Sequence, residues 1–229
     1  MRNTFDRFNG RHQDYQAARP SYAQEFLDWL GELYAPPERY TAADIGSGTG
    51  KLSAQLLAAG FRVCGVEPNP DMRGAAEALL GGDPRFSSSN GTDHDTGLPD
   101  RSVDMVAAAQ AFHWFDGPAF ARECRRILRP GGRAVLVWNV RGSAPMNQAL
   151  AQVFREHCPS FHGFTGGMGE DDPRIRDFFG GAYEKRRFPN PLTLDRDRFL
   201  RRCFSSSYAL REGDADYEAF RAALEALFD

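Results

Sequence analysis

Residues 43–50 read Ala-Asp-Ile-Gly-Ser-Gly-Thr-Gly, and this stretch, with glycines at positions 46, 48 and 50, decides the fold of the chain. Residues 40–45 have the apolar character of a short buried strand. The glycines that follow let the backbone turn sharply and approach a ligand where a Cβ atom would clash. Beyond them, Leu52, Leu56 and Leu57 recur at helical spacing. A strand, a glycine-rich loop and a helix in this order predict a cofactor loop.

A second predicted strand ends on an acid. Residues 61–66 are largely apolar, and Glu67 follows them at the position where a carboxylate can accept hydrogen bonds from both hydroxyls of a ribose. The alternative is a solvated strand end. A charge that closes an apolar strand is costly unless a ligand or solvent compensates it, and this favours the ribose. The chain is expected to hold a nucleoside.

The glycine spacing argues against two phosphate-binding loops. A dinucleotide loop, Gly-x-Gly-x-x-Gly, needs a glycine where Lys51 stands, and a P-loop alignment puts Ile45 at its first glycine and Leu52 after its lysine. What remains, Asp44 followed by Gly-x-Gly-x-Gly, resembles motif I of the class I S-adenosylmethionine-dependent methyltransferases. The cofactor of that family has a ribose and a methionyl tail but no phosphate.

The resemblance covers roughly residues 40–141 and is closest to the small-molecule branch with methyltransferase type 11 domains. Further blocks in the order of that family are residues 90–93 with 98–104, 110–116 and 126–133. Gly-x-Gly-x-Gly alone is a weak signal, whereas four blocks in the right order are specific. The resemblance implies an α/β fold with a doubly wound, mostly parallel, Rossmann-like sheet and helices on both faces.

The alternation of strand and helix signals also indicates a parallel sheet within a single domain over residues 1–229. That domain comprises an N-terminal helical lid segment (1–39), a cofactor-binding core (40–141), and a substrate-covering insertion with the C-terminal part (142–229). Strands are expected at 40–45, 61–66, 85–89, 103–109, 133–139 and 182–188, and helices near 50–59, 70–80, 117–128, 145–157 and 217–228. Gly131 and Gly132 are expected to end the helix near 117–128.

The sequence departs from the family at its end. The resemblance implies a seventh, antiparallel strand between strands five and six, but no residues remain after Asp229 to build it. Unpaired buried backbone groups are costly. We therefore expect that the chain is truncated, that another segment fills the gap, or that the exposed edge pairs with a second copy in a homodimer.

The resemblance also implies cofactor contacts. Asp44 would orient the loop or bind the methionyl amine, with a structural cap as the alternative. Thr92 and Asp93 would lie beside the adenine, in a stretch that also reads as a polar loop. Arg19 would pair with the cofactor carboxylate, although an arginine there is as often solvated. The full expected set is Arg19, Asp44, Gly46, Gly48, Gly50, Glu67, Pro68, Thr92, Asp93 and Gln110.

The expected substrate pocket rests on the same resemblance. Aromatic side chains can line a methyl-transfer tunnel because a sulfonium attracts their faces. The expected pocket residues are Tyr15, Tyr22, Phe112, Trp114, Asn139 and Tyr208, with Trp138, Arg141 and Ser207 as further candidates by position. His113 could act as a general base, or it could be a hydrogen-bonded packing residue.

The composition of the chain limits the kinds of partner and the cellular location that we expect. The net charge is −3 and the arginines are scattered, which argues against a nucleic-acid partner. The four cysteines, Cys64, Cys124, Cys158 and Cys203, have no metal-type spacing and are expected to be reduced thiols. No signal peptide and no apolar stretch of about 20 residues is visible, so we expect a cytoplasmic protein without a membrane span.

The sequence therefore predicts methyl transfer from S-adenosylmethionine to a small-molecule acceptor, with S-adenosylhomocysteine as product and no metal. Two alternatives remain open. One is an NAD-dependent oxidoreductase with a Rossmann-like fold, and the other is a non-catalytic S-adenosylmethionine-binding protein.

Overall fold

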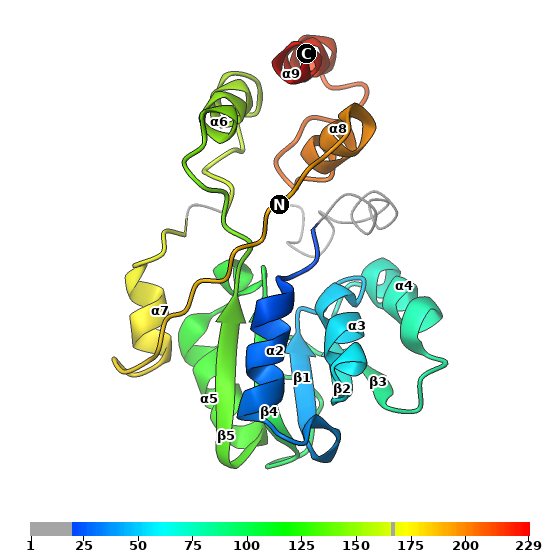
Figure 1. Ribbon diagram of the computed structural model, residues 1–229, viewed down its shortest axis with the longest axis vertical. Coiled ribbons are helices and arrows are strands. Elements are labelled where there is room, and N and C mark those ends of the chain that lie inside the picture. Colours follow the sequence, from blue (N-terminus) through cyan, green and yellow to red (C-terminus); the bar gives the residue numbers. More distant parts are fainter. Residues whose placement is uncertain (1–19, 166–167) are drawn as a thin grey trace.

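The fold is built on a five-stranded sheet whose neighbouring strands are all parallel (Figure 1). The computed structural model describes residues 20–165 and 168–229. The order across the sheet is β3-β2-β1-β4-β5. The strands are β1 (Thr41–Ile45), β2 (Arg62–Val66), β3 (Phe86–Ser89), β4 (Val103–Ala109) and β5 (Leu128–Val137). The predicted α/β class and the five strands expected between residues 40 and 139 are confirmed.

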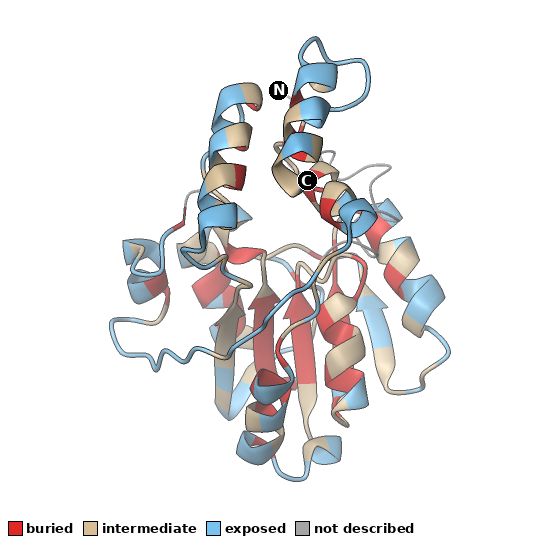
Figure 2. Ribbon diagram, turned by 45° about the horizontal axis from the view of Figure 1, so that its top comes forward, coloured by how far each residue is buried: buried red, intermediate tan, exposed pale blue. Residues whose placement is uncertain are grey.

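Helices cover both faces of this sheet. Alternate residues of one strand face opposite ways, so Met105 joins a core with α2 and α3, while Val106 joins a core with α5 and α7. Figure 2 shows the central strands buried, as expected for a parallel sheet covered on both sides. The helices around the sheet are α2 (Gln24–Leu33), α3 (Lys51–Ala58), α4 (Pro70–Leu80), α5 (Gly117–Ile127) and α7 (Pro173–Phe178).

The turn from α5 into β5 differs from the prediction. The expected glycine stop at Gly131 and Gly132 is wrong, because α5 already ends at Ile127 and Leu128 adopts an extended conformation that pairs with Val103. The glycines instead lie inside β5, in an irregularity where the register shifts. Gly131 has a φ of +83°, which a glycine adopts without a steric penalty.

A separate layer of helices lies beyond the carboxyl ends of the strands (Figure 1). It consists of α6 (Pro145–His157), α8 (Arg196–Phe204) and α9 (Tyr217–Phe228), which share a core around Phe154, Phe220 and Leu224. The predicted helices near 145–157 and 217–228 are confirmed, whereas α7 and α8 were not expected. None of the described helices is long and apolar enough to span a membrane.

The predicted sixth strand at 182–188 is wrong. This segment has no regular secondary structure and runs across the molecule between α7 and α8 (Figure 1). Its only half-buried side chain is Phe188, which packs on Phe26 and Trp29 of α2 with ring centroids 5.8 and 6.0 Å apart. The charged residues before it remain exposed, and Lys185 pairs with Asp171.

The sheet consequently ends at β5 within the described residues. Residues 195–229 form α8 and α9 and supply no strand. Since neither the sixth nor the seventh strand forms, β5 is the edge strand of the sheet in the described part of the chain. The segment 182–190 does not pair with β5 as a strand. It is linked to the end of the sheet by the Asn190 side chain, which donates to Asn139 Oδ1 (2.8 Å) and to the Ser21 carbonyl (2.9 Å).

All four cysteines are buried and none forms a disulfide, which confirms the expectation of free thiols. Cys64 and Cys124 lie in the core on the α5 face of the sheet, and Cys158 and Cys203 lie in the core of the helical layer. They therefore contribute to packing.

Candidate cofactor and substrate site

The glycine loop between β1 and α3 adopts a conformation that requires its glycines. Gly46, Gly48 and Gly50 have φ values of +70°, +56° and +80°, which side-chain-bearing residues rarely adopt. A Cβ atom on Gly46 would lie 2.8 Å from the Ala111 Cβ. At Gly48, in contrast, an added Cβ would meet no atom within 4 Å. The backbone of Gly48 therefore borders open space that a ligand can enter.

Glu67 connects this loop to the end of β2. Its Oε2 accepts a hydrogen bond from the Gly48 N–H and its Oε1 accepts one from the Asn69 N–H, both at 2.9 Å. Burial raises the pKa of the carboxyl group, and the two N–H donors oppose this shift. Each oxygen retains a second lone pair, so hydroxyl groups of a ligand can still donate to it.

Asp44, the last acid before the glycines, is fully buried at the floor of the loop. Its Oδ2 accepts a hydrogen bond from the Ser53 hydroxyl at 2.7 Å, whereas its buried Oδ1 has no hydrogen-bond partner. Burial raises the pKa of Asp44 from 3.8 to about 6, with the Ser53 hydrogen bonds opposing and the charge of Glu67 adding to the shift. A buried carboxylate oxygen without a partner is a suitable acceptor for an ammonium group.

We expect Asp44→Asn to stabilise the ligand-free protein above pH 6. The pKa of Asp44 is higher in the folded than in the unfolded protein, so its protonated carboxyl stabilises the folded state. This contribution to the free energy of unfolding is complete below pH 3.8 and is lost as the pH rises to about 6. At about 1.4 kcal/mol per pH unit, this loss is about 3 kcal/mol. Chemical unfolding of both proteins between pH 3 and 8 should show that the free energy of unfolding of the variant rises relative to that of the wild type between pH 3.8 and about 6. A constant difference across the window would contradict the assignment.

A cavity opens above the loop, between the sheet edge and the helical layer. Eight of the predicted residues line it, counting the further candidate Arg141: Tyr22, Asp44, Gly46, Gly48, Gln110, Asn139, Arg141 and Tyr208. Tyr208 comes from the segment between α8 and α9, so the helical layer closes the cavity from above. The fold thus brings together predicted residues that are up to 186 positions apart in the sequence, from Tyr22 to Tyr208.

Gln110 and Asn139 form the wall at the ends of β4 and β5. Gln110 has a φ of +56°, unusual for a non-glycine residue, and its backbone N–H donates to the Val137 carbonyl at 2.8 Å. Its side-chain amide donates to the Asn139 carbonyl at 3.3 Å. A strained backbone held by hydrogen bonds at a sheet edge is typical of functional positions.

The residues expected at the adenine, Thr92 and Asp93, do not line this cavity. Asp93 accepts a hydrogen bond from the Asp116 N–H at 3.1 Å, and its other oxygen lies 3.1 Å from His94 Nδ1. The Thr92 N–H donates to the Asp95 carbonyl at 2.8 Å. The Thr92 N–H could reach a ring nitrogen of the adenine only if it gave up its hydrogen bond to the Asp95 carbonyl. Pro68 also lies outside the cavity lining, and its carbonyl accepts from Arg73 at 3.3 Å.

The aromatic segment after β4 differs from the predicted pocket wall. Phe112 is 2% exposed and packs against Phe178 and Phe120, with ring centroids 5.2 and 6.2 Å apart. Its placement in the substrate pocket is wrong, because the helices α5 and α7 offer its apolar ring a dry core. Trp114 is 37% exposed and lies 4.8 Å from the His113 ring, and neither lines the cavity. Tyr15 and Arg19 lie outside the described residues.

Lys51, Phe164 and Arg202 are among the lining residues that were not predicted as site residues. Lys51, whose pKa is lowered by burial, served in the sequence only to exclude a dinucleotide loop. Arg202 belongs to the unexpected helix α8, and Phe164 to the glycine-rich loop after α6. No local pattern marks either residue, because only the packing of the helical layer on the sheet brings them to the cavity.

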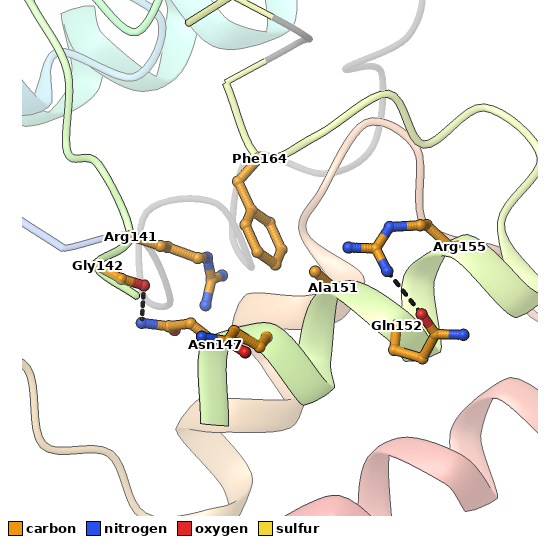
Figure 3. A pocket seen from close by; sticks show the side chains of 8 residues that line it. Arg141, Gly142, Asn147, Ala151, Gln152, Arg155 and Phe164 are labelled. Carbon is orange, nitrogen blue, oxygen red and sulfur yellow. Dashed lines mark hydrogen bonds between the residues drawn. The ribbon is translucent and has the colours of Figure 1, made fainter. Parts of the chain in front are cut away.

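A second, larger cavity of about 410 Å³ adjoins the first (Figure 3). It lies along α6 and shares Arg141 and Phe164 with the cavity above the loop. Its other lining residues are Gly142, Asn147, Gln148, Ala151, Gln152 and Arg155. The smaller cavity carries the glycine loop and Asp44, so it is the better candidate for a cofactor.

Comparison with known proteins adds an independent finding. Residues 43–136 match the model of the methyltransferase domain. An uncharacterized methyltransferase of Mycobacterium tuberculosis is 42% identical over 127 residues, covering 56% of this chain and 49% of the relative. One from Schizosaccharomyces pombe is 31% identical over 147 residues, covering 63% of this chain and 57% of the relative. The chain spans about half the length of these curated relatives.

Solved structures extend the likeness into the helical layer. A putative type II methyltransferase from Anaeromyxobacter dehalogenans is 29% identical with a TM-score of 0.59, over 92% of this chain and 89% of that one. A putative methyltransferase from an antibiotic biosynthesis pathway of Anabaena variabilis is 25% identical with a TM-score of 0.66, over 92% and 87%.

Proposed function

The chain belongs to the class I S-adenosylmethionine-dependent methyltransferase family, and from this premise we propose that it transfers a methyl group from S-adenosylmethionine to a small-molecule acceptor. The observation that carries the proposal is the buried Oδ1 of Asp44, without a hydrogen-bond partner, in the cavity bordered by the open face of Gly48. A ligand with a cationic amine and an extended tail fits this combination.

The described residues fit the parts of this cofactor. Asp44 would hold the methionyl amine and Gly48 would allow close approach of the backbone. Glu67 would accept the ribose hydroxyls with its remaining lone pairs. Asp93 would lie toward the adenine, and Gln110 toward the methionyl portion.

The cofactor, when bound, supplies a methyl carbon on positively charged sulfur; the acceptor's lone pair forms the new bond as the carbon–sulfur pair returns to sulfur, giving S-adenosylhomocysteine. The protein then has to align the two molecules and exclude water. Tyr208 and Phe164, from the helical layer, cover the cavity and serve this exclusion. The acceptor's proton, where it has one, leaves to solvent or to a base.

The His113 ring packs on Trp114 and does not line the cavity, so His113 is a proposed base only for an acceptor that extends beyond the cavity. Its replacement by alanine would reduce methyl transfer only if the bound acceptor reaches it. The nucleophilic atom of the acceptor can be oxygen, nitrogen, sulfur or carbon.

Thermal unfolding with S-adenosylhomocysteine and, separately, with NAD tests the cofactor. A ligand that binds only the native state raises the melting temperature, so we expect a rise with the first and none with the second. A rise with NAD alone would instead favour an oxidoreductase. Transfer of a labelled methyl group to acceptors then separates an enzyme from a non-catalytic binding protein.

A further inference from the structure

The cavity along α6 is positively charged. Its lining includes the guanidinium groups of Arg141 and Arg155 and three side-chain amides, and none of the described residues that line it is acidic. Its volume of about 410 Å³ lies within the range of small-molecule pockets, about 300–1,000 Å³. The chemistry and size together indicate an anionic small molecule.

The two guanidinium groups point toward the middle of this cavity from opposite sides, with Phe164 and Ala151 between them (Figure 3). Each group is held in place by a neighbour. Arg141 stacks over the Phe164 ring at 4.4 Å, and Arg155 donates to Gln152 Oε1 at 2.6 Å. A planar guanidinium held in this way loses little further freedom when it binds a carboxylate or phosphate with two parallel hydrogen bonds.

The cavity is continuous with the proposed methyl-transfer site. Arg141 and Phe164 line both cavities, whereas Arg155 lines only the one along α6. A ligand anchored at Arg155 therefore extends past Arg141 toward the glycine loop. This places its far end next to the cofactor and its anchored end in the second cavity.

We propose that the cavity along α6 binds the methyl acceptor, and that this acceptor carries an acidic group, a carboxylate or a phosphate, held by Arg155 at the end remote from the glycine loop. That this ligand is the methyl acceptor rests on the proposed function, whereas the binding of an acid in the cavity does not. A cationic molecule would be repelled by both arginines, and a neutral one would not accept the charge-assisted hydrogen bonds that Arg155 can donate to an acid.

Calorimetry at constant ionic strength with benzoate, phenyl phosphate and the neutral benzamide tests the cavity. We expect at least one acid to bind at least tenfold more tightly than benzamide. Arg155→Gln should remove this advantage and Arg155→Lys should remove part of it, because lysine keeps the charge but not the planar fork. Arg125→Gln is the matched control, since Arg125 is exposed on α5 and lines neither cavity. A preference for benzoate or for phenyl phosphate distinguishes the two kinds of acid.

The inference is overturned if neither acid binds better than benzamide, or if Arg155→Gln binds the acid as the wild type does. S-adenosylhomocysteine should bind wild type and Arg155→Gln within about twofold of each other, because Arg155 lies outside the cofactor cavity. If S-adenosylhomocysteine does not bind to the wild type, the proposed function alone is refuted. If neither acid binds more tightly than benzamide, the acceptor assignment alone is refuted.

Discussion

Gly48→Val is expected to abolish measurable binding of S-adenosylhomocysteine while the protein remains folded. The Cβ of residue 48 would project into space with no protein atom within 4 Å, so a branched side chain there would occupy the volume proposed for the cofactor. The φ of +56° adds strain for a β-branched residue, and the Gly48 N–H that bonds to Glu67 would shift with it. Calorimetry should show at least a hundredfold loss of affinity.

Gly131→Val is the matched control for backbone strain. Gly131 also has a positive φ, +83°, and open space around its absent Cβ, but it lies in β5 away from the loop. Both variants should lose stability, and only Gly48→Val should lose the ligand. Micromolar binding by folded Gly48→Val would contradict the placement of the cofactor over this glycine.

The cofactor core could be predicted because its signals are local. The glycines after β1 need positive φ angles, the acid after β2 ends an apolar run, and the leucines of α3 recur at helical spacing. Each signal lies within a few residues of the element that it predicts. The sheet order then follows from the parallel topology that the family resemblance implies.

The rest depended on tertiary packing. Residues 182–188 contain the aromatic residues Tyr183 and Phe188, as a strand would, but the four charged residues between them are exposed, and only Phe188 is half-buried, against α2. Phe112 was expected in a pocket because of its position after β4. Its burial depends on α7, a helix of six residues that no periodicity revealed.

The structure also changes the account of Glu67. The sequence suggested a carboxylate whose function is to accept ribose hydroxyls, and the structure shows that it already holds the loop through the Gly48 N–H and the first turn before α4 through the Asn69 N–H. The same side chain therefore sets the position of the glycine that borders the cavity. The proposed ribose contact and the loop geometry are coupled through one residue.

Glu67→Gln is expected to weaken S-adenosylhomocysteine binding about ten- to a hundredfold. The substitution keeps the shape but removes the charge, and hydrogen bonds to charged groups contribute about 1.5–3 kcal/mol. The variant also has one acceptor oxygen for two N–H donors, so either Gly48 or Asn69 loses its partner. Because burial raises the pKa of Glu67, the charged form is already disfavoured in the folded protein, and its removal should not unfold the chain.

The measurement is calorimetric titration of Glu67→Gln beside Glu25→Gln, which removes an equal charge from an exposed position on α2. Equal affinities of the two variants would place the ribose contact on another residue. A weaker affinity in Glu67→Gln for S-adenosylhomocysteine, with unchanged affinity for homocysteine at the methionyl end, would assign the lost energy to the nucleoside. If affinity for homocysteine fell equally, the loss would instead come from displacement of Gly48, because homocysteine has no ribose for Glu67 to contact directly.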